Sequence, residues 1–122
     1  MAVKSYRDLN VWERAMDPVV EAYGVAKRLP KSETYGLVSQ IQRAAVSVPA
    51  NIAEGHGREH LGDYLHHLSV ANGSLMELET HLLLLPRLSY GAANDVATAL
   101  QMSREVGRML AALTRSLKNR KP

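Results

Sequence analysis

The sequence predicts an all-α fold, specifically an antiparallel up-down-up-down four-helix bundle. Apolar residues recur at helical spacing in four separate stretches, and short segments rich in glycine, proline, serine and asparagine separate these stretches. Alanine, leucine, valine and methionine supply the apolar residues, with no phenylalanine in the 122-residue chain. This length predicts a single domain over residues 1–122, with a short N-terminal arm at 1–7 and a basic C-terminal tail at 118–122.

The first helix is predicted after the arm, with Asp8 as its N-cap and its end at Leu29 and Pro30. Pro18 interrupts this helix and predicts a local kink, because an interior proline removes one backbone hydrogen bond. Trp12 is interpreted as a core anchor. The apolar residues that repeat at spacings of three and four are Leu9, Trp12, Met16, Val19, Tyr23 and Ala26.

The second helix, which Ser32 or Thr34 can cap, contains residues 39–55 (SQIQRAAVSVPANIAEG), a stretch that is apolar on two sides. One side is an ordinary core stripe formed by Leu37, Ile41, Ala44, Val48 and Ile52. The other side is formed mostly by small residues, namely Ser39, Val46, Ala50 and Ala53. Small side chains let a second backbone approach closely, so we interpret this side as a subunit interface. The alternative is a central helix buried wholly within its own bundle.

A polar line separates these two sides and consists of Gln40, Arg43, Ser47, Asn51 and Glu54. We expect Arg43, Asn51 and Glu54 to form a buried polar motif, in which Asn51 and Glu54 are hydrogen-bonded to Arg43 or to backbone freed at Pro49. The apolar pattern continues in phase beyond Pro49, which favours one kinked helix over a break with Ser47 as a new cap. Gly55 and Gly57 are predicted to end the helix.

The third helix has the clearest periodicity in the chain and is predicted to end at Pro86. Its four heptads are formed by Leu61, Leu68, Leu75 and Leu82, each followed three residues later by Tyr64, Ala71, Leu78 or Leu85. Asn94 or Asp95 can cap the fourth helix, in which Gly107 is expected to allow a close helix crossing. The apolar residues of the fourth helix are Val96, Leu100, Met109, Leu110, Leu113 and Leu117.

Several classes of function are disfavoured by composition and motifs. The chain has no cysteine, no apolar run of the roughly 20 residues that a membrane span needs, and no secretory signal. We therefore expect a soluble cytoplasmic protein. His60, Asp63 and His67, with His56 one turn earlier, could face a metal ion, but a solvated helix flank is the favoured interpretation. Nucleotide-binding and nucleophile motifs are absent, so we expect no enzyme, cofactor or metal.

Charge is distributed unevenly along the chain, which has a formal net charge of +3. Residues 59–86 contain four acids and no lysine or arginine, whereas residues 104–122 contain six basic residues and Glu105. Four of these basic residues fall within about 80° of arc on a helical projection, namely Arg104, Arg108, Arg115 and Lys118. The pattern predicts a nucleic-acid-binding surface formed by Arg104, Arg108, Arg115, Lys118, Arg120 and Lys121. The alternative is that these cations only stabilise a helix C-terminus.

Nearly the whole chain resembles the small four-helix-bundle proteins encoded in intervening sequences of bacterial 23S ribosomal RNA genes. The matching segments are residues 6–12 (YRDLNVW), 33–37 (ETYGL), 39–55 and 73–78 (GSLMEL). The resemblance implies a ring-shaped homopentamer and kinship with the accessory proteins of diversity-generating retroelements, which bind nucleic acid and a reverse transcriptase. Pro18 and the turn at residues 56–62 are less typical. No catalytic residue is known for the family.

These observations give one leading hypothesis and two alternatives. We expect a non-catalytic homopentamer that binds RNA or DNA, with an accessory or scaffold role toward a partner protein such as a reverse transcriptase. The first alternative is a structural protein-interaction module whose basic face only confers solubility. The second is a metal-dependent enzyme that uses His60, Asp63 and His67.

Overall fold

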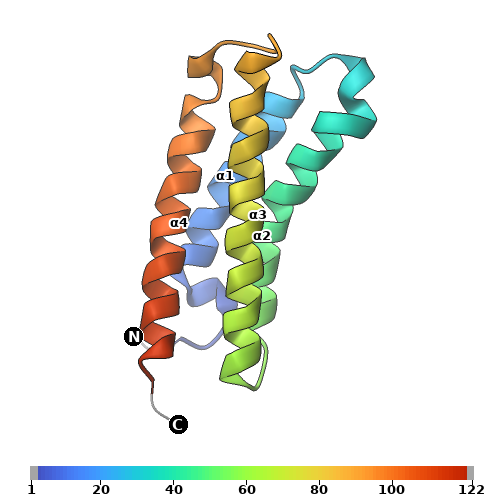
Figure 1. Cartoon of the computed structure of the whole chain (residues 1–122). Helices are drawn as coiled ribbons and strands as arrows, with labels where there is room; N and C mark the ends of the chain where they lie inside the picture. The colour runs from blue at the N-terminus through green and yellow to red at the C-terminus, as the bar shows by residue number, and fades with distance from the viewer. Residues whose placement is uncertain (1–2, 121–122) are drawn as a thin grey trace.

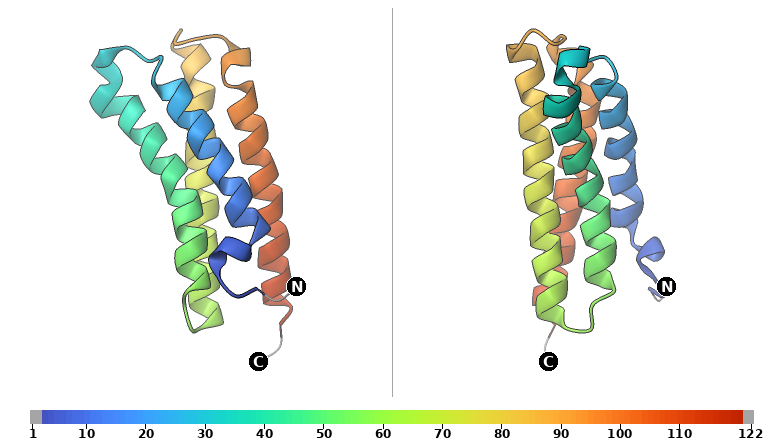
Figure 2. Two further views of the ribbon diagram at one scale, coloured as in Figure 1. Left: turned by 180° about the vertical axis from the view of Figure 1, so that it is seen from behind. Right: turned by 90° about the vertical axis from the view of Figure 1, so that its right-hand side faces the viewer.

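Four helices form the bundle in the computed structural model, which describes residues 3–120 (Figure 1). They are α1 (Asn10–Ala26), α2 (Ser39–His56), α3 (Leu61–Arg87) and α4 (Ala97–Lys118). Consecutive helices run in opposite directions, each packs against the next, and α4 returns to α1 (Figures 1 and 2). The predicted four-helix bundle is confirmed. None of the helices in residues 3–120 combines the length and apolar character needed to span a bilayer.

The core consists of two apolar clusters stacked along the bundle axis. One lies near the connections at residues 27–38 and 88–96 and includes Val25, Ile41 and Leu82. The second lies toward the chain termini and includes Ile52 and Leu110, with Trp12 packed half-buried against it. All members of the predicted heptads are buried or half-buried except the first, Leu61, which is exposed at the start of α3. The periodicity of α3 therefore identified its core face correctly.

The predicted N-cap of the first helix is wrong. The Asp8 carboxylate accepts a hydrogen bond from the Lys4 backbone N–H at 2.9 Å, and Ser5 accepts from the Arg7 N–H at 3.2 Å. These bonds cap a 3₁₀ turn, Tyr6–Asp8, that precedes α1. Asp8 turns back toward the preceding N–H groups, so it has no bond to the first turn of α1. The helix also ends at Ala26, before the predicted end at Leu29 and Pro30.

The caps predicted for the second and fourth helices are also wrong. Glu33, rather than Ser32 or Thr34, accepts from the Leu37 N–H at 3.3 Å at a π-helical turn, Thr34–Val38, that leads into α2. Its second carboxylate oxygen accepts from the Tyr90 hydroxyl at 2.9 Å, which connects this turn to the α3–α4 connection. Before α4, the Asp95 carboxylate accepts a hydrogen bond from the Ala92 backbone N–H and so caps a 3₁₀ turn at Ala93–Asp95. No side chain caps α4 itself.

Helix α2 is continuous through Pro49, so Ser47 does not cap a restarted helix. The N-terminal part of α2 leans outward from the bundle, whereas its C-terminal part runs alongside α3 (Figures 1 and 2). The assignment of this change of direction to Pro49 stays a prediction. Helix α1 likewise continues through Pro18, which is buried.

Candidate nucleic-acid and subunit interfaces

The cations predicted to bind nucleic acid are all exposed where the structure describes them. Arg104, Arg108, Arg115 and Lys118 project from α4, and Arg120 follows the helix end. Lys121 lies outside the described residues. Within residues 3–120, no acidic side chain forms an ion pair with any of these cations. Their charges are therefore open to an anionic ligand.

The acid within this basic segment is engaged on another side of α4. Glu105 is half-buried and forms an ion pair with Arg14 of α1, across the packed α1–α4 interface. The carboxylate is held toward α1, so it does not offset the exposed arginines. Burial raises the pKa of Tyr64 above 10.0, and Arg120 opposes that rise.

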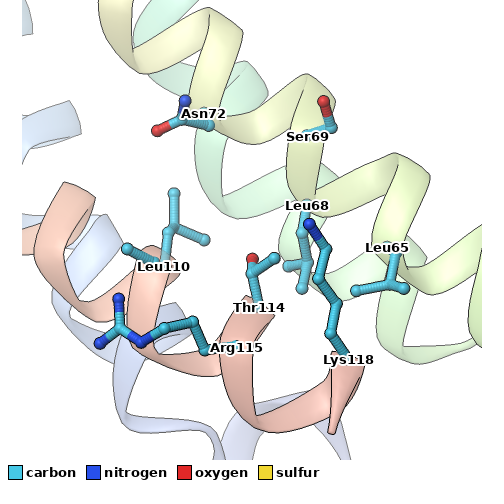
Figure 3. A pocket seen from close by; sticks show the side chains of 9 residues that line it. Leu65, Leu68, Ser69, Asn72, Leu110, Thr114, Arg115 and Lys118 are labelled. Carbon is cyan, nitrogen blue, oxygen red and sulfur yellow. The ribbon is translucent and has the colours of Figure 1, made fainter.

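A groove between α3 and α4 lies beside two of the predicted cations (Figure 3). It has a volume of about 350 Å³, and Arg115 and Lys118 contribute to its lining from α4. The facing lining includes Ser69 and Asn72 of α3. Sequence reasoning missed both α3 residues, because the periodicity of one helix does not show which surface residues face a neighbouring helix.

The predicted subunit surface on α2 is partly open to solvent. Val46 is 42% exposed and Ala50 is exposed, whereas Ser39 and Ala53 are half-buried. The alternative of an α2 buried wholly within its own bundle is therefore wrong. Val46 also lines a shallow apolar hollow of about 540 Å³, to which α1 contributes Val20 and Tyr23. Val20 was not part of the apolar stripe predicted for the first helix and is 74% exposed, whereas Tyr23 was part of that stripe and is 41% exposed.

The prediction of a buried polar motif is wrong for two of its three residues, because these two are not buried. Arg43 and Glu54 are exposed, and Glu54 forms an ion pair with Arg58 at 2.8 Å. The polar line of α2 lies along the edge of the α2–α3 interface, so its long charged side chains reach water. Together with Ser74 and other residues, Arg43 lines a polar groove of about 500 Å³ between the two helices.

Asn51 is half-buried and hydrogen-bonded, as predicted, but its partners differ from those expected. Its amide nitrogen donates to the Ser47 carbonyl at 2.8 Å, and its oxygen lies 3.1 Å from Nδ1 of His67. Ser47 in turn lies 2.8 Å from the Ser74 hydroxyl. These contacts connect α2 to α3 through side chains and pair the half-buried polar groups along the edge of the interface.

The candidate metal ligands do not converge in the structure. His60 and Asp63 are exposed, and His67 is engaged with Asn51. Within residues 3–120, no group of three or more His, Cys, Asp or Glu residues is arranged to hold a metal ion.

These features define a four-helix-bundle protein with a cationic α4 surface and an exposed apolar surface on α1 and α2. The chain belongs to the 23S rRNA-intervening sequence protein family, whose family model matches residues 7–112. The match includes Arg104 and Arg108 but ends before Arg115. No curated protein matches the sequence.

One solved structure with the same fold belongs to a protein of unknown function from the S23 ribosomal protein family of Bacteroides thetaiotaomicron VPI-5482. It shares 24% sequence identity with this chain, with a TM-score of 0.79. The alignment covers 86% of this chain and 98% of that chain. This likeness supports the bundle fold.

Proposed function

We propose that the chain is a non-catalytic subunit of a homopentamer that binds RNA or DNA through the cationic surface of α4. The observation that carries this proposal is the set of exposed α4 cations without an acidic partner in residues 3–120, while Glu105 is paired with Arg14. Lysine and arginine contacts to phosphates supply affinity that depends little on base sequence. A phosphate backbone is therefore the ligand that this surface fits.

Assembly strengthens this interaction. Arg104 and Lys118 are fourteen residues apart, which corresponds to about 21 Å along a helix. One subunit therefore reaches several phosphates with few side chains, and its affinity is low. A pentamer has five such surfaces and a formal charge of five times +3, or +15. Linked sites raise avidity without new contacts if one strand engages several of them.

The pentameric number and an accessory or scaffold role rest on the family resemblance. The exposed apolar surface at Val20 and Val46 supports assembly, because apolar surface of this kind marks contact sites. We also propose that the protein acts with a partner protein such as a reverse transcriptase, and that it is located in the cytoplasm.

The test is a titration of labelled RNA and DNA with wild-type protein at several salt concentrations. We expect the affinity to fall on the order of 50-fold between roughly 50 and 200 mM salt, if three or four phosphates are engaged. A variant with Arg104, Arg108 and Arg115 changed to Glu should lose binding. A control with Arg28, Lys31 and Arg87 changed to Glu has the same change in net charge at positions outside α4. It should retain most of the affinity.

Two results would overturn the proposal. One is no binding by wild type at low salt. The other is equal binding by the α4 variant when size measurements show that it keeps the wild-type assembly. Either result would leave the structural interaction module as the better description. The size measurement is needed because loss of the assembly would reduce avidity for an unrelated reason.

A further inference from the structure

The groove between α3 and α4 combines an apolar floor with polar walls. Half-buried Leu65 and exposed Ala111 supply the accessible apolar surface of the floor, whereas Leu68 and Leu110, which also line the groove, are each only 1% exposed. Figure 3 shows that side chains from both helices line this groove. A flat apolar group placed against Leu65 and Ala111 would be removed from water on one face, which is favourable.

Hydrogen-bonding groups lie beside this floor. Ser69 and Asn72 contribute from α3, and Thr114 contributes from α4. Within residues 3–120, none of these three side chains forms a hydrogen bond with another protein group, so a ligand can use their donors and acceptors. The Asn72 amide has both a donor and an acceptor, the combination that pairs with the edge of a nucleobase.

Positive charge completes the groove. Arg115 and Lys118 both line it, and Lys118 extends from α4 toward α3 (Figure 3). The groove therefore places a cation next to an apolar surface and to hydrogen-bonding groups. A nucleotide has the matching chemistry, because a flat base with a polar edge is joined through its sugar to an anionic phosphate.

We propose that this groove holds one unstacked nucleotide of a single strand, an inference that rests on the proposed nucleic-acid binding by α4. The base lies against Leu65 and Ala111, and the adjacent phosphate lies near Arg115 and Lys118. The volume of about 350 Å³ is close to the lower end of the roughly 300–1,000 Å³ of ligand pockets. That size fits a single nucleotide unit rather than a longer segment.

The shape of the site selects single strands over duplexes. In a duplex, the faces of the bases are stacked on one another, so a concave apolar groove cannot contact them. A duplex would engage only the exposed cations and would leave the groove empty. The groove lining contains no aromatic ring, so base stacking on a side chain is absent there. The base contact should therefore add moderate affinity with little base preference.

A substitution that fills the groove without changing any charge tests this proposal. Ala111 is exposed and lines the groove, so Ala111→Leu should occupy the space of the base. Ala112 is also exposed but lies outside the lining, so Ala112→Leu is the matched control. Binding is measured at low salt with a labelled single strand and with a blunt duplex of the same sequence.

We expect wild type to bind the strand more tightly than the duplex. Ala111→Leu should weaken strand binding about fivefold, as expected if roughly 40 Å² of apolar contact with the groove floor is lost, and leave duplex binding unchanged. Ala112→Leu should change neither. A strand that contains one photoreactive thiouridine should also cross-link wild-type protein within residues 65–72 or 110–118. The cross-linking does not depend on a variant folding or assembling normally.

The outcomes separate the two proposals. Equal wild-type affinity for strand and duplex would overturn the groove proposal and leave binding by α4 intact. The groove proposal would also be overturned if an Ala111→Leu variant with the wild-type assembly size bound the strand as wild type does. Cross-links confined to segments other than 65–72 and 110–118 would overturn it as well. Wild type that binds neither probe would instead overturn the proposed function itself.

Discussion

Ser103 is a residue whose contribution to stability can be tested directly. Its side chain is fully buried on α4, and its hydroxyl has no hydrogen-bond partner within residues 3–120. A buried hydroxyl without a partner costs free energy, and alanine is the better helix former. We expect Ser103→Ala to raise the free energy of unfolding by about 1 kcal/mol. Urea denaturation followed by circular dichroism measures this change.

Ser47→Ala is the matched control, because the same atoms are removed from a hydroxyl that has partners. Ser47 lies 2.8 Å from the Ser74 hydroxyl and 3.0 Å from the Asn51 amide nitrogen. Its loss should lower the free energy of unfolding by about 1 kcal/mol. If Ser103→Ala destabilised the protein as much as Ser47→Ala does, the Ser103 hydroxyl must have a partner in solution.

At the scale of the elements, the close crossing of α2 and α3 depends on Gly55. A Cβ atom at this position would lie 2.7 Å from Cβ of His67 and 3.2 Å from the Tyr64 carbonyl oxygen. The obstruction includes backbone, so it cannot be relieved by side-chain rotation alone. We expect Gly55→Ala to lower the free energy of unfolding by about 1–3 kcal/mol, measured in urea at a fixed protein concentration.

Gly73 gives the opposite expectation with the same substitution. It lies within α3, and a Cβ atom there would have no neighbour within 4 Å. Gly73→Ala should therefore raise the free energy of unfolding by about 0.5–1 kcal/mol, because alanine reduces the freedom of the unfolded chain. Similar effects of the two substitutions would contradict the close α2–α3 crossing.

The helices could be predicted from the sequence because burial imposes a period on each of them. The heptads of α3 identified Leu68, Leu75 and Leu82 as core residues, and all three are buried. The caps were predicted wrongly because several polar residues compete for the same N–H groups. Glu33, for example, caps a π-helical turn and also accepts from Tyr90, a residue distant in sequence.

The candidate site was predictable only in part. The spacing of Arg104, Arg108 and Arg115 was sufficient to place three cations on one side of a helix. The apolar floor beside Arg115 was not predictable, because it requires the packing of α3 against α4. The polar line of α2 shows the same limit, since Asn51 and Glu54 share a helical line but differ in how far α3 covers them.

At the scale of the whole molecule, a closed ring requires two different surfaces on each subunit, because its contacts are head to tail. The α1–α2 surface with Val46 and Ala50 is one apolar candidate. Helix α3 provides a second, since Met76 and Leu83 are 46% and 49% exposed. We therefore expect each subunit to place its α1–α2 surface against the α3 surface of its neighbour.

This arrangement predicts how charge at either surface changes the assembly. Wild type should have the mass of a pentamer by light scattering coupled to size-exclusion chromatography. Ala50→Glu and Leu83→Glu should each give monomers, because a buried carboxylate without a partner is costly to desolvate. Ala112→Glu, at an exposed position on α4, should remain pentameric.

A mixture of the Ala50→Glu and Leu83→Glu variants provides the sharpest test of the ring. The Ala50→Glu variant keeps an intact α3 surface, and the Leu83→Glu variant keeps an intact α1–α2 surface. These two surfaces can form one contact, after which neither subunit has an intact surface left for a further contact. The mixture should therefore form a one-to-one dimer, whereas neither variant alone should associate. A wild-type monomer at micromolar concentration would contradict the assembly itself. A mixture that stayed monomeric beside a wild-type pentamer would instead show that the two surfaces do not contact each other.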